Sequence, residues 1–214
     1  MSLIPSSASR KQPSPYGKLL VNALRPHAEI KKIAARRNLY LNIDNVLYCY
    51  LALEGYFGLY RKSDNRMMGI VSCPAILGVT GLVTGHTSIY LKALVPSVVG
   101  KIPLEVVQNA IQEHNLWKPL SQHMMFLFER LYISGEQLSA PTASEIVYTQ
   151  LNELMCEDPD IRQQITAERY IRDKTELSRS RVMGILSELK KDGHIETQKG
   201  ILVNIRELPA KMPS

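Results

Sequence analysis

The sequence has little cysteine, and its three cysteines lie far apart. Cys49, Cys73 and Cys156 form no CxxC pair within the 214 residues. This spacing speaks against the usual zinc motifs and against the disulfide framework of a small secreted domain. We therefore expect no metal and no cofactor, and we expect the reducing cytoplasm as the compartment.

Long hydrophobic runs are also absent. No apolar stretch reaches the roughly 20 residues that a membrane-spanning helix needs. The segment 1–12 is polar and lacks the apolar centre of a signal peptide. We therefore expect no membrane partner.

Catalytic patterns are missing as well. The five histidines are dispersed, and none has a Ser/His/Asp, Cys/His or metal-ligand spacing. A lone histidine is more often a surface or core residue than a catalytic one. We predict that the protein is not an enzyme.

The composition is that of a globular protein with an uneven charge. Hydrophobic residues make up 45% of the chain, and the net charge is +6. Residues 1–40 carry a net charge of +7, residues 41–165 carry −4, and residues 166–214 carry +3. A basic C-terminal segment suits a polyanion, although a solvated basic surface would have the same composition.

The first half of the chain has mainly strand patterns. After a flexible lead-in (1–15), we expect short helices over Lys18–Leu24, ended near Pro26, and over Glu29–Arg37. Runs rich in β-branched and aromatic residues then alternate with turn signals at Glu54-Gly55 and Asp64-Asn65, which predicts a sandwich or barrel. The expected strands are Val46–Leu53, Tyr56–Arg61, Met67–Ser72 and Ser88–Leu94.

Helical periodicity begins after Ile102. A short helix over Pro103–Glu113 precedes a longer one over Trp117–Tyr132, which is apolar on two flanks and so needs two partners. One partner is the sandwich, and the other is the same helix of a second subunit or, alternatively, another part of the same chain. We assign dimerisation to the stripe of Leu116, Leu120, Met124, Leu127 and Leu131. The second flank is Trp117, Met125, Phe128 and Tyr132.

The last seventy residues predict three helices, of which the last two are joined by a tight turn and followed by a β-hairpin. Beyond a linker at Ser134–Ser139, Thr142 and Glu145 form a capping box, and the helix that they open ends at Asp158-Pro159. Thr166 caps a helix that runs to Lys174, and Ser178 caps the next, from Arg179 to Lys191. Gly193 ends that helix, and strands over 195–197 and 201–205 follow. This order of elements describes a winged helix-turn-helix.

The chemistry of the second helix suits DNA. Its apolar face holds Val182, Ile185, Leu186 and Leu189, while small residues on the opposite face let its backbone approach a groove. We predict that Ser178 mainly caps the helix, that Arg179, Ser180 and Arg181 contact DNA, and that Lys191 and Lys199 contact phosphates. The alternative is a three-helix cap whose arginines serve only solubility.

These residues resemble a known family. The stretches SRSRVMGILSEL (178–189) and KKDGHI (190–195), with the wing, resemble the DNA-binding end of the Crp/Fnr regulators, and LYCYLALEG (47–55) resembles a strand and turn of their sensor domain. Within this family, the sequence most resembles the branch that is linked to peroxide resistance. The resemblance implies an α+β fold: an N-terminal jelly roll of the cyclic-nucleotide-binding type, a long dimerisation helix and a C-terminal winged helix-turn-helix.

The chain departs from the family where the nucleotide would bind. The family holds the phosphate with a Gly-Glu pair and an Arg-Ser pair, but here Val79 follows Gly78, and His86-Thr87-Ser88 stands at the second position. Four suitably placed cysteines for an iron–sulfur cluster are absent too. Without the carboxylate and the guanidinium, we expect no cyclic nucleotide. Gly184 and Glu176 also replace family residues, which affects the target sequence.

The resemblance divides the chain into a lead-in (1–15), a degenerate sensor domain (16–113), a dimerisation helix and linker (114–139) and a DNA-binding domain (140–214). It implies a cytoplasmic transcription regulator with a stress role that binds double-stranded DNA as a homodimer, with RNA polymerase as a further partner. The alternative is a protein-interaction module built on the degenerate sandwich. For a redox response we expect Cys73, beside Pro74 at a strand end, although a structural role is the competing interpretation.

Overall fold

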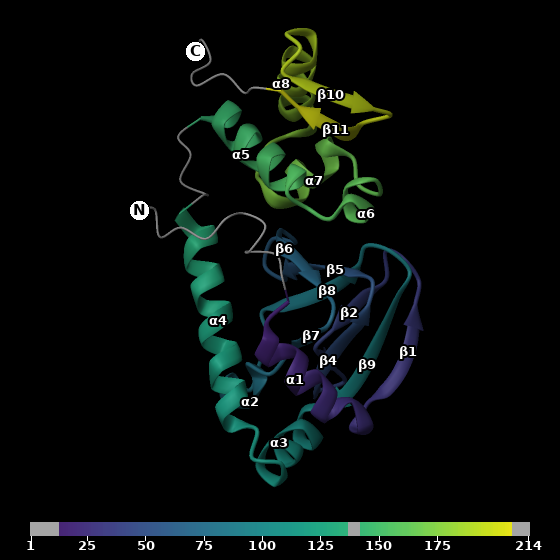
Figure 1. Ribbon diagram of the computed structural model, residues 1–214, viewed down its shortest axis with the longest axis vertical. Helices are drawn as coiled ribbons and strands as arrows, with labels where there is room; N and C mark the ends of the chain where they lie inside the picture. The colour runs from purple at the N-terminus through teal and green to yellow at the C-terminus, as the bar shows by residue number, and fades with distance from the viewer. Residues whose placement is uncertain (1–12, 137–141, 207–214) are drawn as a thin grey trace. The chain divides into compact units, whose positions relative to one another are not determined.

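The computed structural model describes residues 13–136 and 142–206, with side chains at 13–129 and 142–206. The chain divides into two compact units, one spanning residues 12–131 and the other centred on residues 132–214 (Figure 1). The expected lead-in lies mostly outside the described residues. Among the helices that the structure describes, none is both long enough and apolar enough to cross a membrane.

The first unit is a β-sandwich with helices packed on one side. Its elements are α1 (Pro15–Leu24), the 3-10 helix η2 (Arg25–His27), β1 (Glu29–Ile33), β2 (Asn38–Tyr40), β3 (Asn42–Ile43), β4 (Val46–Glu54), β5 (Tyr56–Arg61), β6 (Met67–Ser72), β7 (Ala75–Leu77), α2 (Gly81–Thr84), β8 (Ile89–Ala93), β9 (Ser97–Pro103), α3 (Leu104–Glu113) and α4 (Trp117–Glu136). One sheet has the order β1-β9-β4-β3, with β7 also paired to β4, and the other has the order β2-β8-β5-β6.

The position of β4 in the sandwich explains why its sequence is apolar almost throughout. Because side chains alternate along a strand, Cys49 and Leu51 enter the core beneath the helices, whereas Tyr50 and Ala52 enter the core between the two sheets. Both faces of β4 are therefore covered. The turn that follows requires glycine, since Gly55 has φ +92° and a Cβ there would lie 2.8 Å from Ser97 Cβ.

The strand predictions are confirmed, and one helix prediction is wrong. Tyr56–Arg61 and Met67–Ser72 are strands with the predicted limits, and the helix at Lys18–Leu24 begins three residues earlier. The predicted helix over Glu29–Arg37 is instead β1, which pairs with β9 from Glu29↔Lys101 to Ile33↔Ser97. Its charged residues suit an edge strand, and pairing across the sheet outweighs the local helical pattern.

The helix α4 packs on the first unit with the leucine stripe that we had assigned to a dimer. Leu116 and Leu120 are 8% and 7% exposed and belong to the core with α1 and α3, and Met124 packs against that core. Because these side chains are buried within their own chain, they leave little apolar surface for a second subunit, and the assignment of this stripe to a dimer stays a prediction. Leu127 is half-buried, and the side chain of Leu131 lies outside the described residues.

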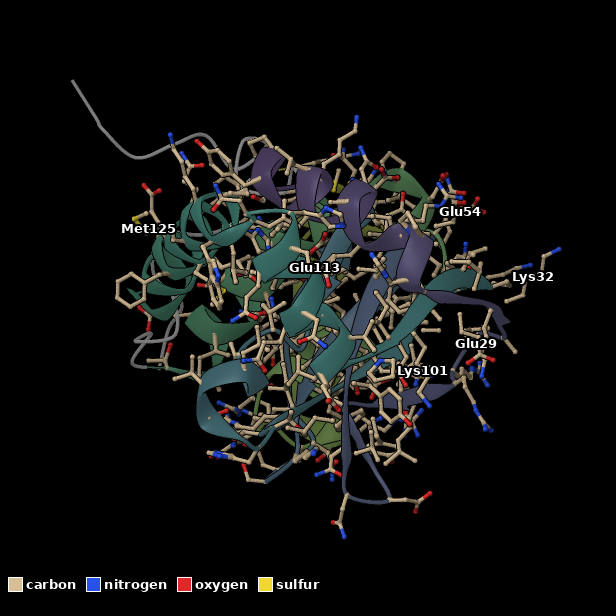
Figure 2. All side chains as sticks on the ribbon, turned by 90° about the horizontal axis from the view of Figure 1, so that it is seen from below. Glu29, Lys32, Glu54, Lys101, Glu113 and Met125 are labelled. Atoms are coloured by element: carbon tan, nitrogen blue, oxygen red, sulfur yellow. The ribbon has the colours of Figure 1, made fainter. Side chains whose placement is uncertain are left out.

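The exposed apolar side chains of α4 come from the other flank. Trp117, Met125 and Phe128 are 47%, 63% and 71% exposed, and Met125 points outward from the helix in Figure 2. The helix also extends to Glu136, so the predicted linker at Ser134–Ser139 is wrong for its first three residues and otherwise lies outside the described residues. The two-sided helix predicted from the sequence thus has one covered and one uncovered flank.

The buried side chain of His123 on α4 should make the stability of the protein depend on pH. The side chain is 3% exposed, and a Cβ on Gly17 of α1 would lie 2.9 Å from its Cε1. Burial lowers the pKa of His123, and the backbone of Ile76 offsets this only in part. The unfolded chain therefore takes up the proton at a higher pH than the folded chain.

We expect the free energy of unfolding to fall as the pH drops below about 6.5, by at most about 1.4 kcal/mol per pH unit for this one proton. Urea unfolding at pH 8 and at pH 5.5 measures the difference. His123→Met should remove part of this dependence, and an equal pH slope in the variant and the parent would contradict the assignment.

The second unit consists of short helices and a hairpin. Its elements are α5 (Ala143–Met155), α6 (Pro159–Arg162), α7 (Ala167–Lys174), α8 (Arg179–Lys191), β10 (Ile195–Gln198) and β11 (Ile201–Ile205). The capping box is confirmed, since Thr142 Oγ1 accepts from Glu145 N and Glu145 Oε2 accepts from Thr142 N. Asp158 does not end α5, which stops at Met155, but caps the extra helix α6.

A buried tyrosine joins the helices of this unit. Tyr170 of α7 is fully buried, and its hydroxyl donates to Glu157 Oε1 at 3.0 Å. Lys174 contacts the same hydroxyl at 3.3 Å and forms an ion pair with Glu153 of α5. Burial and the nearby carboxylates raise the pKa of Tyr170 well above its usual value. The network fixes α7 on α5 and so supports the helix that follows.

Candidate nucleic-acid interface

The helix α8 has one buried face and one exposed face, as predicted. Val182, Ile185, Leu186 and Leu189 are between 0% and 9% exposed and pack in the core of the second unit. The other side carries Ser180, Gly184 and Ser187, all exposed, and a Cβ added at Gly184 would meet no atom within 4 Å. Small residues on an open face let a partner approach the backbone of the helix closely.

The first turn of α8 brings four predicted residues together. Ser178 has extended backbone angles and its Oγ accepts from Arg181 N at 3.2 Å, so it is the N-cap. The side chains of Arg179, Ser180 and Arg181 are exposed. The positive end of the helix dipole is thus combined with two arginines, which suits an anionic ligand.

The structure adds Glu168 to this group. Glu168 of α7 lies 3.7 Å from Arg179 Nε and 3.0 Å from Arg172 Nε, measured from its Oε1. The side chain of Arg179 is 74% exposed and that of Glu168 is 17% exposed, so the pair is weak and Arg179 can exchange it for another anion. From the sequence, the spacing of Glu168 and Arg172 predicts only an ion pair within one helix. The contact of Glu168 with Arg179 could not be predicted, because it joins two helices in the tertiary structure.

The two predicted phosphate-binding lysines lie away from this turn. Lys191 is the last residue of α8, about 18 Å along the axis from its first residue. Lys199 and Gly200 form the tip of the hairpin with φ of 50° and 82°. Gly200 O accepts from Ala167 N at 2.9 Å, so the tip is fixed to the beginning of α7. The predicted residues therefore form three separate positions on one unit.

Ser178 allows its capping role to be separated from its place on the surface. Replacing this cap with alanine should lower the free energy of unfolding by about 0.5–2 kcal/mol, whereas Ser178→Asp should preserve it, because aspartate caps helices as well as serine does. Urea unfolding of the parent and both variants tests this order. Equal stability of Ser178→Ala and the parent would contradict the capping role.

The segment that corresponds to the family's phosphate site holds different chemistry. Gly78 has φ +99°, and a Cβ there would lie 2.6 Å from Tyr48 O. Val79 is only 6% exposed, so an apolar side chain enters the core where the family has glutamate. His86 Nδ1 lies 2.9 Å from Thr84 O, and Thr87 Oγ1 accepts from Lys62 Nζ at 2.9 Å.

The three cysteines differ in burial, from the buried Cys49 to the exposed Cys156, and none of them forms a disulfide. Cys49 is fully buried. Cys73 is half-buried and its thiol donates to Gly55 O at 3.2 Å. Burial and the charge of Glu54 raise the pKa of Cys73 to about 12. Since the thiolate is the reactive form, this environment does not favour the predicted redox role of Cys73.

Comparison with known sequences agrees with this arrangement. Residues 143–210 match the family described as winged helix-turn-helix DNA binding. The chain is 28% identical over 163 residues to the inhibitor of hydrogen peroxide resistance of Escherichia coli (strain K12), covering 76% of this chain and 78% of that protein. The protein of the same name from Salmonella typhimurium is 26% identical over 165 residues, covering 77% and 79% of the two chains.

Solved structures show the same fold at low sequence identity. The global regulator CLP of Xanthomonas campestris, described as responsive to c-di-GMP, has a TM-score of 0.73 and 14% identity over 89% of this chain and all of that chain. A transcriptional regulator of the Crp/Fnr family from Eubacterium rectale has a TM-score of 0.65 and 12% identity over 88% and 90% of the two chains. The chain therefore has the α+β fold of the Crp/Fnr regulators, with a winged helix-turn-helix of the DNA-binding type at its C-terminal end, which is the architecture of a transcription regulator.

Proposed function

We propose that the protein is a sequence-specific transcription regulator that binds double-stranded DNA through α8. The observation that carries this proposal is the first turn of α8, where a capped helix end presents Arg179 and Arg181 to solvent beside exposed small residues. A recognition helix enters the major groove by this end, and its arginines reach guanine edges or phosphates. In this proposal the protein is a regulator and not an enzyme, and it acts where the DNA is, in the cytoplasm.

The phosphate contacts supply affinity, and the first turn supplies sequence choice. In this proposal, Lys199 at the hairpin tip and Lys191 at the end of α8 neutralise phosphates of the bound DNA. Affinity for random duplex DNA should fall steeply with salt, and Lys199→Gln should flatten the logarithmic slope by about 0.9. Lys32→Gln, on a β-strand of the first unit, is the charge-matched control. Salt-independent binding would favour the alternative of a protein-interaction module.

The regulator acts as a homodimer in this proposal. The exposed Trp117, Met125 and Phe128 of α4 form an uncovered apolar flank, and a second copy of the helix is the partner that the fold suggests. A two-fold dimer places two α8 helices about one DNA turn apart, which favours a two-fold operator. We further propose RNA polymerase as a partner and a role in the response to peroxide. Similarity to proteins named inhibitor of hydrogen peroxide resistance supports the second of these.

DNA binding does not require a cyclic nucleotide in this proposal. The support is chemical, since Val79 is buried where a carboxylate would hold the ribose, and no arginine occurs between Met67 and Glu129 to hold the phosphate. DNA affinity should be equal with and without cyclic AMP. A gain in affinity on adding cyclic AMP would overturn this part, and leave the DNA-binding proposal intact.

A further inference from the structure

The β-sandwich has a cavity at the side where the chain crosses from one sheet to the other. Its volume is about 640 Å³, and residues of β1, β2, β4, β9 and the segment 34–37 line it. None of the residues 78–88, where the family's phosphate site would lie, lines this cavity. Ligand pockets have volumes of roughly 300–1,000 Å³, so the cavity is large enough for a small molecule.

The wall of the cavity carries positive charge only. Lys31, Arg36, Arg37 and Lys101 line it, and no carboxylate does. Lys31 is paired with Glu29 outside the wall at 2.9 Å. In contrast, neither arginine has a carboxylate partner within the ranges that the structure describes. Among the described residues, the cavity therefore has two cations without a carboxylate partner.

The positions of these cations are set by the backbone. Arg36 N donates to Ala93 O at 2.7 Å and Ala93 N donates to Arg37 O at 3.0 Å, which ties the crossing segment to β8. Arg36 has φ of 69°, a conformation that residues other than glycine seldom adopt. Lys101 of β9 lies with its Nζ 3.7 Å from the centroid of the Tyr48 ring on β4. The backbone of Arg36 and Arg37 is thus held against β8, and Lys101 is held on β9.

The rest of the wall is mainly apolar or aromatic. Tyr50 and Val99 come from the core between the sheets and are 3% and 1% exposed. Leu39 of β2 adds a third core side chain, and Tyr40 stands at the edge, 47% exposed. Core side chains thus form the floor of the cavity, Tyr40 adds an exposed aromatic edge, and the cations lie beside them.

We propose that this cavity binds a small amphipathic anion, with an apolar body against the apolar and aromatic wall and an acidic headgroup on Arg36, Arg37 and Lys101. The arginines give charge-assisted hydrogen bonds to the headgroup, and contact with the wall removes part of the body from water. The site belongs to the first unit, and binding to it can be measured without DNA, so its failure and a failure of the proposed function are distinguishable.

Calorimetry on the full chain with three probes tests this site: octanoate carries both parts, 1-octanol has only the body, and inorganic pyrophosphate has only the charge. We expect octanoate to bind at least about tenfold more tightly than the other two, the value of one charge-assisted hydrogen bond. An equal affinity for 1-octanol or for pyrophosphate, or no octanoate binding, would overturn the proposal.

Variants locate the binding. Arg36→Gln/Arg37→Gln should weaken octanoate binding by about tenfold or more, and Lys101→Gln, which leaves the crossing segment intact, should weaken it as well. Lys32→Gln is the matched control, because Lys32 lies on β1 next to Lys31, does not line the cavity and extends away from the sandwich, unlike Lys101 (Figure 2). Equal losses in the control and in the cavity variants would overturn the assignment.

Discussion

Phe128→Glu is expected to convert the protein from a dimer to a monomer and to weaken binding to a two-fold operator by about 10²–10⁴-fold. Phe128 is 71% exposed on α4 beside Met125, which is 63% exposed. A glutamate there would place a charge in the apolar contact of two helices, where its desolvation is unfavourable. Without the dimer, the second α8 helix no longer binds at a high effective concentration.

Light scattering and DNA titration of the same samples measure both effects. Val83→Glu is the matched control, because Val83 is 91% exposed and the variant gains the same charge on α2, not on α4. Leu120→Glu is unsuitable, since Leu120 belongs to the core of the first unit. A dimeric Phe128→Glu protein with the parent's operator affinity would show that this flank of α4 is not the interface.

Arg179→Ala is expected to lower the affinity for the preferred operator by about 1–3 kcal/mol and to relax the choice at one base pair. The physical reason is the loss of a guanidinium that is 74% exposed at the first turn of α8 and can bond two acceptors of a guanine. Affinity for random DNA should change far less, because that affinity depends on phosphate contacts. Titrations of operator and random duplexes separate the two effects.

Glu168→Gln refines the same prediction. Glu168 positions Arg179 through a contact of 3.7 Å, and its charge also opposes the approach of phosphates. We expect the variant to bind random DNA slightly more tightly while its preference for the operator declines. Identical losses on operator and random DNA in Arg179→Ala would instead make Arg179 a phosphate contact.

The recognition unit could be predicted in detail because its signals are local. Ser178 caps α8, the four apolar residues of its buried face have helical spacing, and Gly193 has the left-handed φ of 76° that a helix end uses. Each of these features depends on residues within one or two turns of helix. The limits of α7, α8 and the hairpin therefore follow from the sequence alone.

The errors lie where distant residues decide. β1 looks helical in sequence, and only its pairing with β9, about seventy residues later, makes it a strand. Periodicity predicts the two apolar flanks of α4 but not which of them is buried, because burial depends on which flank meets α1 and α3. Likewise, the contact of Glu168 with Arg179 and the cations of the cavity come from separate elements.

Selection of bound duplexes from a random pool by the purified protein, without any nucleotide added, tests the central claim most directly. The proposal predicts enrichment of one two-fold site whose half-sites are about one DNA turn apart, bound at least about 10³-fold more tightly than random DNA. Arg179→Ala should lose preference at one symmetric pair of positions. A pool that stays random after repeated rounds, with no salt-dependent DNA binding, would contradict the proposal that this chain is a DNA-binding regulator.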